Sequence, residues 1–328
     1  MTTMPLLRLS AIAILNISLA AFTAGAFNTQ SAHAAAPMVK KSAPGYYRMM
    51  LGDFEITALS DGTVNLPMDK LLTNTTPAAT AKAFSSYFVK TPVETSVNTY
   101  LINTGTKLVM VDTGAAGLFG PTLGNLLVNL KASGYQPDQI DEIYITHMHG
   151  DHIGGLMDGD KLAFPNAVVR ADKRDADFWL NQANMDKAAA GDKGGFQGAM
   201  ASINPYVKAG KFLPFEGSTA LVPGVKATSA YGHTPGHTTY VVESKGEKLV
   251  LWGDLMHVAS VQFDHPGVTI QFDSNSKAAA AERAKAYAAA AKEGYLVAAT
   301  HLSFPGIGHL RSAGKGYTWM PLNYSVLR

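Results

Sequence analysis

Three imidazoles and a carboxylate stand close together in residues 147–152, directly after a short apolar run. His147 and His149 are two positions apart, so on an extended or tightly turning segment both rings can project to one side and share a cation. Asp151 and His152 then face a second cation beside the first. Imidazole with carboxylate suits zinc and other borderline divalent ions, and two ions roughly 3.5–4 Å apart are a common hydrolytic device. The pattern predicts a two-metal site in preference to a histidine-rich surface loop.

Further ligands are expected where a His or Asp ends an apolar strand later in the chain. His233 and His237 belong to residues 231–237, whose glycines allow the backbone to turn sharply. Asp254 follows the apolar residues 249–252, and His301 follows residues 296–299. Each of these places puts a candidate ligand at the carboxyl end of a predicted strand.

These four pieces resemble the metallo-β-lactamase superfamily, whose signature is HxHxDH followed by His, Asp and His on later strands. Their order and spacing agree with the signature, and residues 111–114 look like the family's structural VDTG turn. The resemblance implies two divalent ions, with zinc preferred over manganese, cobalt or iron. One ion would be held by His147, His149 and His233, the other by Asp151, His152 and His301, and Asp254 would bridge them. The family uses the first His of the HTPGH run as a ligand, so His237 is expected to hydrogen-bond behind the ligands.

A narrower resemblance points to the methyl parathion hydrolases and their dihydrocoumarin hydrolase and lactonase relatives. It rests on residues 42–48, 114–121 and 301–309 and covers nearly the whole mature chain. The resemblance implies an ester-bond hydrolase in which a hydroxide shared by two metal ions is the nucleophile, so that no serine or cysteine nucleophile is needed. Asp151 could also carry a proton to the leaving group, which is a hypothesis.

The same resemblance offers Phe119, Trp179 and Phe196 as aromatic walls of a substrate pocket. An aromatic pocket favours a flat, apolar ligand. Each of the three could instead be an ordinary core aromatic. Trp179 and Phe196 lie in residues 173–199, which we call the lid segment. It is predicted to be helical at first and then a loose polar loop. This loop either covers the site or is an ordinary surface loop.

Four positions depart from the methyl parathion hydrolases. His257 stands three residues after Asp254, where those enzymes carry leucine, and Leu72, Ile270 and Phe272 stand where they carry Arg, Thr and Leu. In acyl-homoserine lactonases, the residue three after the bridging Asp is a tyrosine that donates to the substrate carbonyl, and an imidazole could do similar work. A bulky His with Ile270 and Phe272 would also narrow the space for a phosphotriester. His257 as a buried core histidine is the alternative.

We therefore predict a lactonase or arylesterase acting on an aromatic lactone such as dihydrocoumarin, with organophosphate triester hydrolysis as the alternative and acyl-homoserine lactonase as a more remote one. A phosphodiesterase would use the same motif, but the chain lacks a basic patch. An oxygen-reducing di-iron protein would carry an acidic ligand in place of one His. A non-catalytic metal-binding protein and a true β-lactamase are disfavoured by the complete ligand set and by the bridging Asp254.

The ends and the composition of the chain suggest an exported small-molecule enzyme. Residues 1–34 have an early Arg8, an apolar run and a small-x-small cleavage site, which predicts a secretory signal peptide in preference to a retained membrane anchor. Residues 35–328 would then form a single periplasmic or secreted domain. The chain has no cysteine, so stability must come from packing and metal. A net charge of +2 without a basic patch argues against nucleic acid, and a homodimer is expected by analogy with related enzymes.

The coarse element pattern predicts an α/β fold. Alternation over residues 52–59 predicts a strand, and residues 97–102 and 108–111 predict a hairpin around a turn. A helix is expected to begin at Leu123 and end at Gly134, and another is expected over the alanine-rich residues 279–291. The whole fits an αββα metallo-β-lactamase sandwich, with two mixed sheets face to face, helices outside and the metals along one edge.

Overall fold

The computed structural model describes residues 36–327, and the chain divides between Lys41 and Ser42. The predicted signal peptide, residues 1–34, lies outside the described residues, so it stays a prediction. The fold is that of the unit that begins at Ser42. Among the described residues, no helix is both long enough and apolar enough to cross a bilayer.

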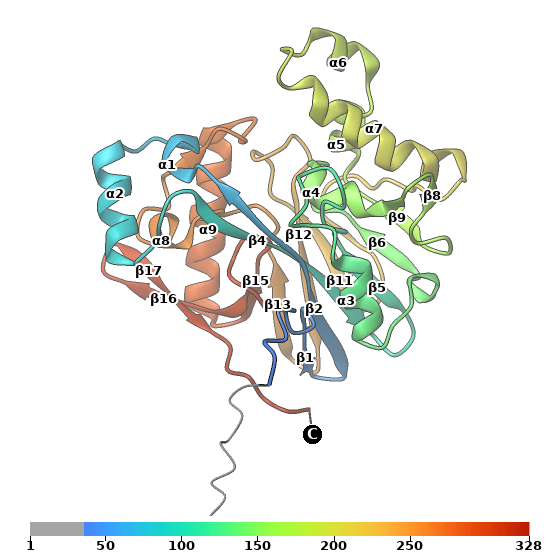
Figure 1. Cartoon of the computed structure of the whole chain (residues 1–328), viewed down its shortest axis with the longest axis horizontal. Helices are drawn as coiled ribbons and strands as arrows, with labels where there is room; N and C mark the ends of the chain where they lie inside the picture. The colour runs from blue at the N-terminus through green and yellow to red at the C-terminus, as the bar shows by residue number, and fades with distance from the viewer. Residues whose placement is uncertain (1–35, 328) are drawn as a thin grey trace, which may run out of the picture. The chain divides into compact units, whose positions relative to one another are not determined.

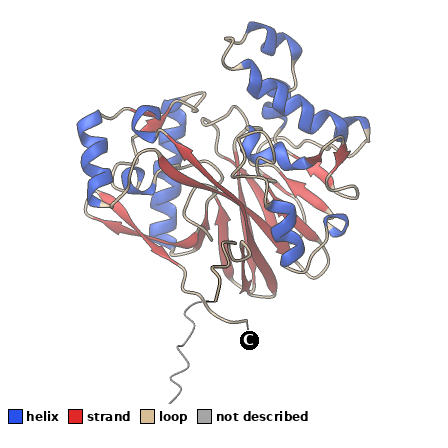
Figure 2. Ribbon diagram, viewed as in Figure 1, coloured by secondary structure: helices blue, strands red, loops and turns tan. Residues whose placement is uncertain are grey.

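Two large sheets form the centre of this unit (Figures 1 and 2). The first has the order β1-β2-β4-β5-β6-β9, with β1 Tyr46–Leu51, β2 Phe54–Leu66, β4 Val93–Asn103, β5 Leu108–Val111, β6 Glu142–Tyr144 and β9 Val168–Arg170. The second has the order β10-β11-β12-β13-β15-β16-β17, with β10 Thr219–Ala220, β11 Val225–Ser229, β12 Thr238–Ser244, β13 Glu247–Leu251, β15 Leu296–Ala298, β16 Ile307–Ala313 and β17 Gly316–Pro321. Both sheets are mixed, because β5, β6 and β9 are parallel neighbours, as are β13 and β15.

Helices and short strands complete the unit. The helices are α1 Met68–Leu71, α2 Pro77–Ser86, α3 Leu126–Ala132, α4 Gly150–Ile153, α5 Lys173–Trp179, α6 Gln182–Lys187, α7 Lys193–Lys208, α8 Ala259–Gln262 and α9 Ser276–Glu293, with 3-10 turns at Pro137–Gln139 and Gly154–Leu156. Two small sheets pair β3 Leu72–Thr73 with β14 Thr269–Ile270, and β7 Met157–Asp158 with β8 Lys161–Leu162.

Alternating side chains explain the layers. In β5, Val109 and Val111 enter the core between the two sheets, whereas Met110 enters the core under α3, α5 and α7. In β13, Leu251 faces the same inter-sheet core and Val250 faces the core beneath α9. A strand whose residues are apolar on both faces must be covered on both sides. The predicted αββα sandwich is therefore confirmed.

Several predicted elements agree with the structure in type but differ in their bounds. The alanine-rich helix is α9, whose amino end is capped by the Asn275 side chain and whose carboxyl end stops at Gly294 in a left-handed conformation. The helix expected from Leu123 begins only at Leu126, because Gly124 has a φ of 88°. The predicted hairpin is formed by β4 and β5, which pair antiparallel.

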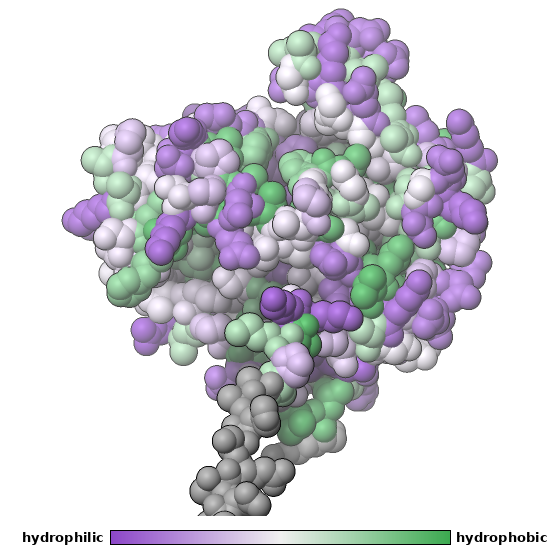
Figure 3. Space-filling view, viewed as in Figure 1, coloured by the Kyte–Doolittle hydropathy of each residue, from purple (hydrophilic) through white to green (hydrophobic). Residues whose placement is uncertain are grey.

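The lid segment agrees with the prediction at its start and differs after it. α5 is the predicted helix, but the stretch predicted to be a loose polar loop contains α6 and the first turns of α7. Figure 1 shows these helices standing above the edge of the first sheet, and in Figure 3 the α6 end of the lid segment is mainly hydrophilic. The glycine-rich residues 191–195, which sequence reasoning interpreted as loose, form a turn and the first residues of α7.

Candidate metal centre and substrate cavity

The HxHxDH run follows strand β6 of the first sheet. β6 ends at Tyr144, and the chain then passes His147 and His149 into α4, whose single turn carries Asp151 and His152. His149 stands at the helix N-cap with extended backbone angles. Because the chain changes from strand to helix within a few residues, the four side chains can face a common centre.

The remaining candidate ligands come from the second sheet. Asp254 follows β13 and His301 follows β15, and the carboxyl ends of these parallel neighbours meet at one edge of the sheet. His233 lies in the connection between β11 and β12. Gly253, with a φ of 55°, turns the backbone so tightly that a Cβ there would lie 2.9 Å from Nε2 of His237. Both sheets thus contribute to one cluster.

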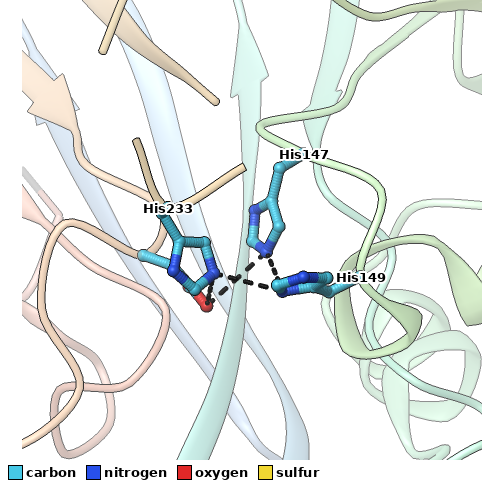
Figure 4. Close-up of side chains that lie close together, drawn as sticks. His147, His149 and His233 are labelled. Atoms are coloured by element: carbon cyan, nitrogen blue, oxygen red, sulfur yellow. Dashed lines mark hydrogen bonds and ion pairs between the residues drawn. The ribbon is translucent and has the colours of Figure 1, made fainter. Parts of the chain in front are cut away.

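His147, His149, His233 and Asp254 form a first group, whose candidate ligand atoms all lie within 4.8 Å of one another. Nδ1 of His149 lies 3.0 Å from Nε2 of His147 and 3.1 Å from Nε2 of His233. Figure 4 shows these three rings pointing toward one another from separate segments. Burial holds the pKa of His147 and of His149 well below the usual histidine value, so both rings are neutral at pH 7 and carry a lone pair that a metal can use.

Asp151, His152 and His301 form a second group, again within 4.8 Å. Oδ2 of Asp151 lies 3.7 Å from Nε2 of His152 and 3.5 Å from Nε2 of His301. The His152 side chain is fully buried, whereas the Asp151 side chain is 17% exposed. The second group is therefore open to solvent through its carboxylate.

Asp254 lies between the two groups. Its Oδ1 is 3.2 Å from Nε2 of His152, and its Oδ2 is 3.1 Å from Nε2 of His301 and 3.4 Å from Nε2 of His233. Burial disfavours the ionised carboxylate, but the surrounding imidazoles outweigh burial and hold the pKa of Asp254 well below its usual value. An ionised carboxylate in this position can face two cations at once.

The cluster fits two divalent cations. Nε2 of His152 and Oδ1 of Asp254 are buried and lack a hydrogen-bond partner among the described residues. In the first group, ring nitrogens face one another where neutral imidazoles have lone pairs. A buried polar atom without a partner costs about 1–3 kcal/mol. Cations between these atoms would satisfy them, and the mixture of imidazole and carboxylate suits zinc.

Two carboxylates behind the cluster fix the histidines, and sequence reasoning missed the role of both. Oδ2 of Asp112 lies 2.7 Å from Nδ1 of His152, and the same carboxylate accepts hydrogen bonds from the amide and hydroxyl of Thr146. Oδ1 of Asp273 lies 2.8 Å from Nδ1 of His233. Each bond places the proton on Nδ1 and leaves Nε2 free for a metal. Asp112 could have been found through the VDTG turn, whereas no sequence signal marks Asp273.

His301 and His237 are oriented by the backbone. Nδ1 of His301 donates to the carbonyl of Ser96 at 2.9 Å. Nε2 of His237 accepts a hydrogen bond of 3.1 Å from the amide of Asp254, and its Nδ1 donates to the carbonyl of Ala230. His237 belongs to none of the metal-binding groups among the described residues. It lies behind Asp254, where the family pattern suggested.

Asp175 ties the lid segment to the cluster. This buried carboxylate in α5 accepts hydrogen bonds from the amide of Met148, the hydroxyl of Thr234 and the amide of Gly236. Burial raises its pKa to about 6, although these donors work in the opposite direction. The first helix of the lid segment is thus joined to both histidine-bearing loops.

A cavity of about 840 Å³ opens above the second group. Five of the predicted pocket residues line it: Phe119, Trp179, Phe196, His257 and Phe272. Asp151, Asp254 and His301 also line it, and Val64, Leu66 and Met68 add apolar side chains. The cavity therefore lies between the metal-binding residues and an apolar and aromatic surround.

Two predicted pocket residues, Leu72 and Ile270, do not line this cavity. They face each other across the small sheet of β3 and β14, and both are buried in a hydrophobic cluster with Met68 and Phe84. Their burial follows from the pairing of two short strands, which the sequence alone does not reveal. Leu72 and Ile270 are thus core residues, and Met68 is the member of this cluster that also lines the cavity.

His257 lies at the boundary between the cluster and the cavity. Its Nε2 is 3.2 Å from Oδ2 of Asp254, its ring stacks on His301 at 5.1 Å between centroids, and the ring of Phe272 lies 6.1 Å away. Together with Asp254 and His301 it forms a third group of potential metal ligands. Its Nδ1 is buried and has no partner among the described residues. Burial lowers the pKa of His257 to about 4, so the ring is neutral at pH 7.

Comparison with known proteins agrees with this geometry. Residues 92–301 match the Metallo-beta-lactamase superfamily. The solved structure of the hydrolase AbOPH of the beta lactamase superfamily is 38% identical, covers 87% of this chain and 100% of its own, and superposes with a TM-score of 0.83. AidC, a dizinc quorum-quenching lactonase solved with the product N-hexnoyl-L-homoserine, is 28% identical over 86% of this chain and 99% of its own, with a TM-score of 0.76. This chain belongs to the metallo-beta-lactamase superfamily.

Curated relatives are more distant. An N-acyl homoserine lactonase of Bacillus thuringiensis is 29% identical over 171 residues, and the beta-lactamase-like protein 2 homolog of Drosophila melanogaster is 30% identical over 163 residues. The match covers 46% of this chain and 60% of the length of the Bacillus lactonase. The similarity is therefore to lactonases and hydrolases of the superfamily in general. The expected closeness to methyl parathion hydrolases stays a prediction.

Proposed function

We propose that the protein is a dinuclear metal-dependent hydrolase of ester bonds that prefers aromatic lactones and aryl esters of the dihydrocoumarin type. The observation that carries the proposal is the position of His257, a neutral imidazole between the bridging carboxylate and an aromatic cavity wall. No serine or cysteine nucleophile is required.

The proposed ligands are those that the two groups bring together. His147, His149 and His233 would hold one ion, Asp151, His152 and His301 the other, and Asp254 would touch both. We propose zinc for both ions. When bound, the two ions would lower the pKa of water to supply a nucleophile near neutral pH and would polarise the substrate carbonyl. Asp151 is the partly exposed carboxylate of the set, so it is the residue that can pass a proton to the leaving alkoxide or phenoxide.

His257 would stabilise the charge that develops on the carbonyl oxygen. Its neutral ring carries a single N–H, which Nε2 directs at Oδ2 of Asp254, 3.2 Å away. With that carboxylate engaged by the cations, the same N–H would be available to the substrate oxygen beside it. The backbone amide of His257 is fixed by the side chain of Gln262 at 2.7 Å, which limits the movement of the ring. A fixed donor aimed at a developing oxyanion accelerates such reactions by about 10²–10³.

The aromatic wall would select a flat substrate. Trp179 packs 4.8 Å from Phe196 and 5.3 Å from the ring of His149, so it lies against the first metal group. The ring of Phe272 lies 6.1 Å from that of His257 and also lines the cavity. Rings that flank the cluster favour a planar lactone over a tetrahedral phosphotriester.

The predicted homodimer and export to the periplasm or medium remain proposals, supported by analogy and by the signal-peptide pattern.

N-acyl homoserine lactones are a second candidate substrate class. The similarity to AidC over nearly its full length supports a lactone with an acyl arm. The cavity of about 840 Å³ is also larger than a bicyclic lactone needs, and its apolar wall of Val64, Leu66 and Met68 could receive an acyl chain.

Side-by-side kinetics of the zinc-loaded protein test the proposal. The specificity constants for dihydrocoumarin, N-hexanoyl-homoserine lactone and methyl parathion are measured for the parent, for His257→Leu and for the matched control His265→Leu, whose side chain is exposed. We expect dihydrocoumarin to be the best substrate and His257→Leu to lose about 100-fold on it, with His265→Leu unchanged. A higher specificity constant for methyl parathion or for the acyl lactone in the parent would overturn the aromatic preference.

A further inference from the structure

One fully buried arginine stands outside the metal centre. Arg283 lies in the middle of α9, and its side chain is fully buried. Its Nε donates to the carbonyl of Leu255, and its Nη1 donates to the carbonyls of Pro266 and Val268 at 2.9 and 2.7 Å. A guanidinium is costly to bury, so its retention in a core of apolar side chains needs a physical reason.

The three carbonyls belong to the two ends of one segment, residues 255–268, which we call the His257 segment. Leu255 directly follows Asp254, whereas Pro266 and Val268 close the segment before β14. A single planar guanidinium therefore joins the beginning and the end of the segment. Arginine alone among the side chains has five N–H donors in a rigid fork, which allows it to reach all three acceptors.

Gln262 completes the arrangement from inside the segment. Its Oε1 accepts from the amides of His257 and Val258 at 2.7 and 2.9 Å, and its Nε2 donates 3.0 Å to the carbonyl of Val268. The carbonyl of Val268 is thus shared by Gln262 and Arg283. The segment is held by these two polar side chains, which are both fully buried.

The bonds of Arg283 lead to both sides of the cavity. On one side, Leu255 is one residue from Asp254 and two from His257. On the other side, Val268 precedes β14 and then Phe272 and Asp273, and the Asp273 carboxylate accepts from the amide of Ile270 and holds His233. Any change in the spacing of the segment ends would move a metal-facing carboxylate and a cavity wall together.

We propose that Arg283 is a positioning residue that sets the placement of Asp254 and His257 by clasping the two ends of the His257 segment. It touches neither substrate nor metal. The proposal rests on the proposed function for its kinetic readout only. Loss of the clasp should weaken metal binding and lower kcat, while KM, which depends on the aromatic wall, changes less.

The experiment compares Arg283→Lys and Arg283→Met with two controls on the same helix, using the full-length protein. Ala290→Gly destabilises α9 without touching the segment, because glycine lowers helix stability. Lys285→Met removes an exposed charge. Zinc affinity is measured by competition with a chelator, the environment of cobalt-substituted protein by its visible spectrum, and stability by thermal unfolding. Kinetics use the ester that the parent cleaves fastest.

We expect both Arg283 variants to lose about tenfold or more in affinity for the more weakly bound zinc ion. Their cobalt spectra should shift, and kcat should fall by a similar factor. Ala290→Gly and Lys285→Met should leave zinc affinity, the cobalt spectrum and kcat unchanged. The proposal is wrong if Arg283→Lys unfolds at a lower temperature, as Ala290→Gly does, yet keeps zinc affinity and kcat within twofold of the parent. If Arg283→Met does not fold, Arg283→Lys carries the test. If no ester is cleaved, the proposed function fails, while zinc affinity and the cobalt spectrum still decide the role of Arg283.

Discussion

The metal cluster and the cavity wall are built in different ways. The cluster side chains come from the connections and the single helical turn that follow strands. Nδ1 of His152, of His233 and of His301 is in each case hydrogen-bonded to a carboxylate or a backbone carbonyl. The cavity wall comes from β2, α1, loops and the lid segment, and its apolar rings are held by packing. Phe119 and Phe272 are exposed, whereas Trp179 and Phe196 are buried.

This difference separates two tasks. Side chains fixed by directional bonds can keep ligand atoms where cations need them, and packing contacts can be exchanged without disturbing that geometry. We therefore expect substitutions behind the cluster to abolish catalysis for every substrate, and substitutions in the wall to change which substrate is preferred.

The largest effect is expected from removing the metal ions. Dialysis against a strong chelator should lower hydrolysis at least about 100-fold, because the nucleophile and the carbonyl polarisation are lost together. It should also lower the free energy of unfolding by about 4 kcal/mol for each ion lost, relative to protein in zinc at a thousandfold excess over the Kd of each site. Calorimetry and activity before and after zinc is restored measure both. Full activity in metal-free protein would disprove the two-metal site.

Loss of the carboxylate behind one histidine should have the next largest effect. Asp112→Ala leaves Nδ1 of His152 without its partner and removes two bonds from Thr146. Zinc affinity should fall by about 10–100-fold, with all substrates affected equally. Zinc competition assays measure it, with the exposed Asp160→Ala as a control. A variant that loses activity on only one substrate would break the proposed separation of tasks.

Asp175 joins the two regions, and its titration should be visible in stability. Burial raises its pKa in the folded protein to about 6, above the unfolded value of 3.8. A carboxyl with a raised folded pKa contributes most below pH 4, and that contribution is lost as the pH rises through 6, at a cost of roughly 3 kcal/mol. Asp175→Asn removes this titration. The difference in unfolding free energy between parent and variant should therefore change between pH 4 and pH 7, and a constant difference would contradict the raised pKa.

The smallest effect is expected at the rim of the cavity. Phe119 is 43% exposed and packs beside Gly150, where an added Cβ would meet its ring at 3.0 Å. Phe119→Ala should raise KM for aromatic esters by about five- to tenfold, because one apolar contact contributes about 1–1.5 kcal/mol, and should leave kcat and zinc affinity unchanged. Phe88→Ala, which removes a 94% exposed ring from another surface, is the control. A fall in kcat without a change in KM would place Phe119 in the catalytic machinery.

The same contrast explains what the sequence could predict. The candidate ligands follow apolar runs at recognisable spacings, and periodic patterns mark the strands that deliver them, so both the sandwich and the cluster were predictable. The roles of Asp273 and Asp175 were not predictable, because they depend on contacts between residues far apart in the sequence. Asp273 is 40 residues from His233, and Asp175 is 59 residues from Thr234 and 61 from Gly236.

Pocket residues were predicted less well for a related reason. Leu72 and Ile270 belong to strands of two residues each, and such short elements carry no periodic signal. Whether a single apolar side chain faces a cavity or a core depends on which face of its strand is covered, which the local sequence does not encode. Phe272, two residues after Ile270, turns out of the same core and reaches the cavity.

The cluster draws its members from both sheets, and this has a consequence for how the molecule comes apart. Cations held there would join two halves that otherwise meet through the apolar core and a few hydrogen bonds, such as those from the hydroxyls of Tyr100 and Tyr240 to the carbonyls of Ala299 and Ile145. With the metal ions bound, the two halves should unfold as one cooperative unit. Without the metal ions, the ligand-bearing ends of the two sheets face each other with no bond between the histidines. The chain should then unfold in two steps instead of one.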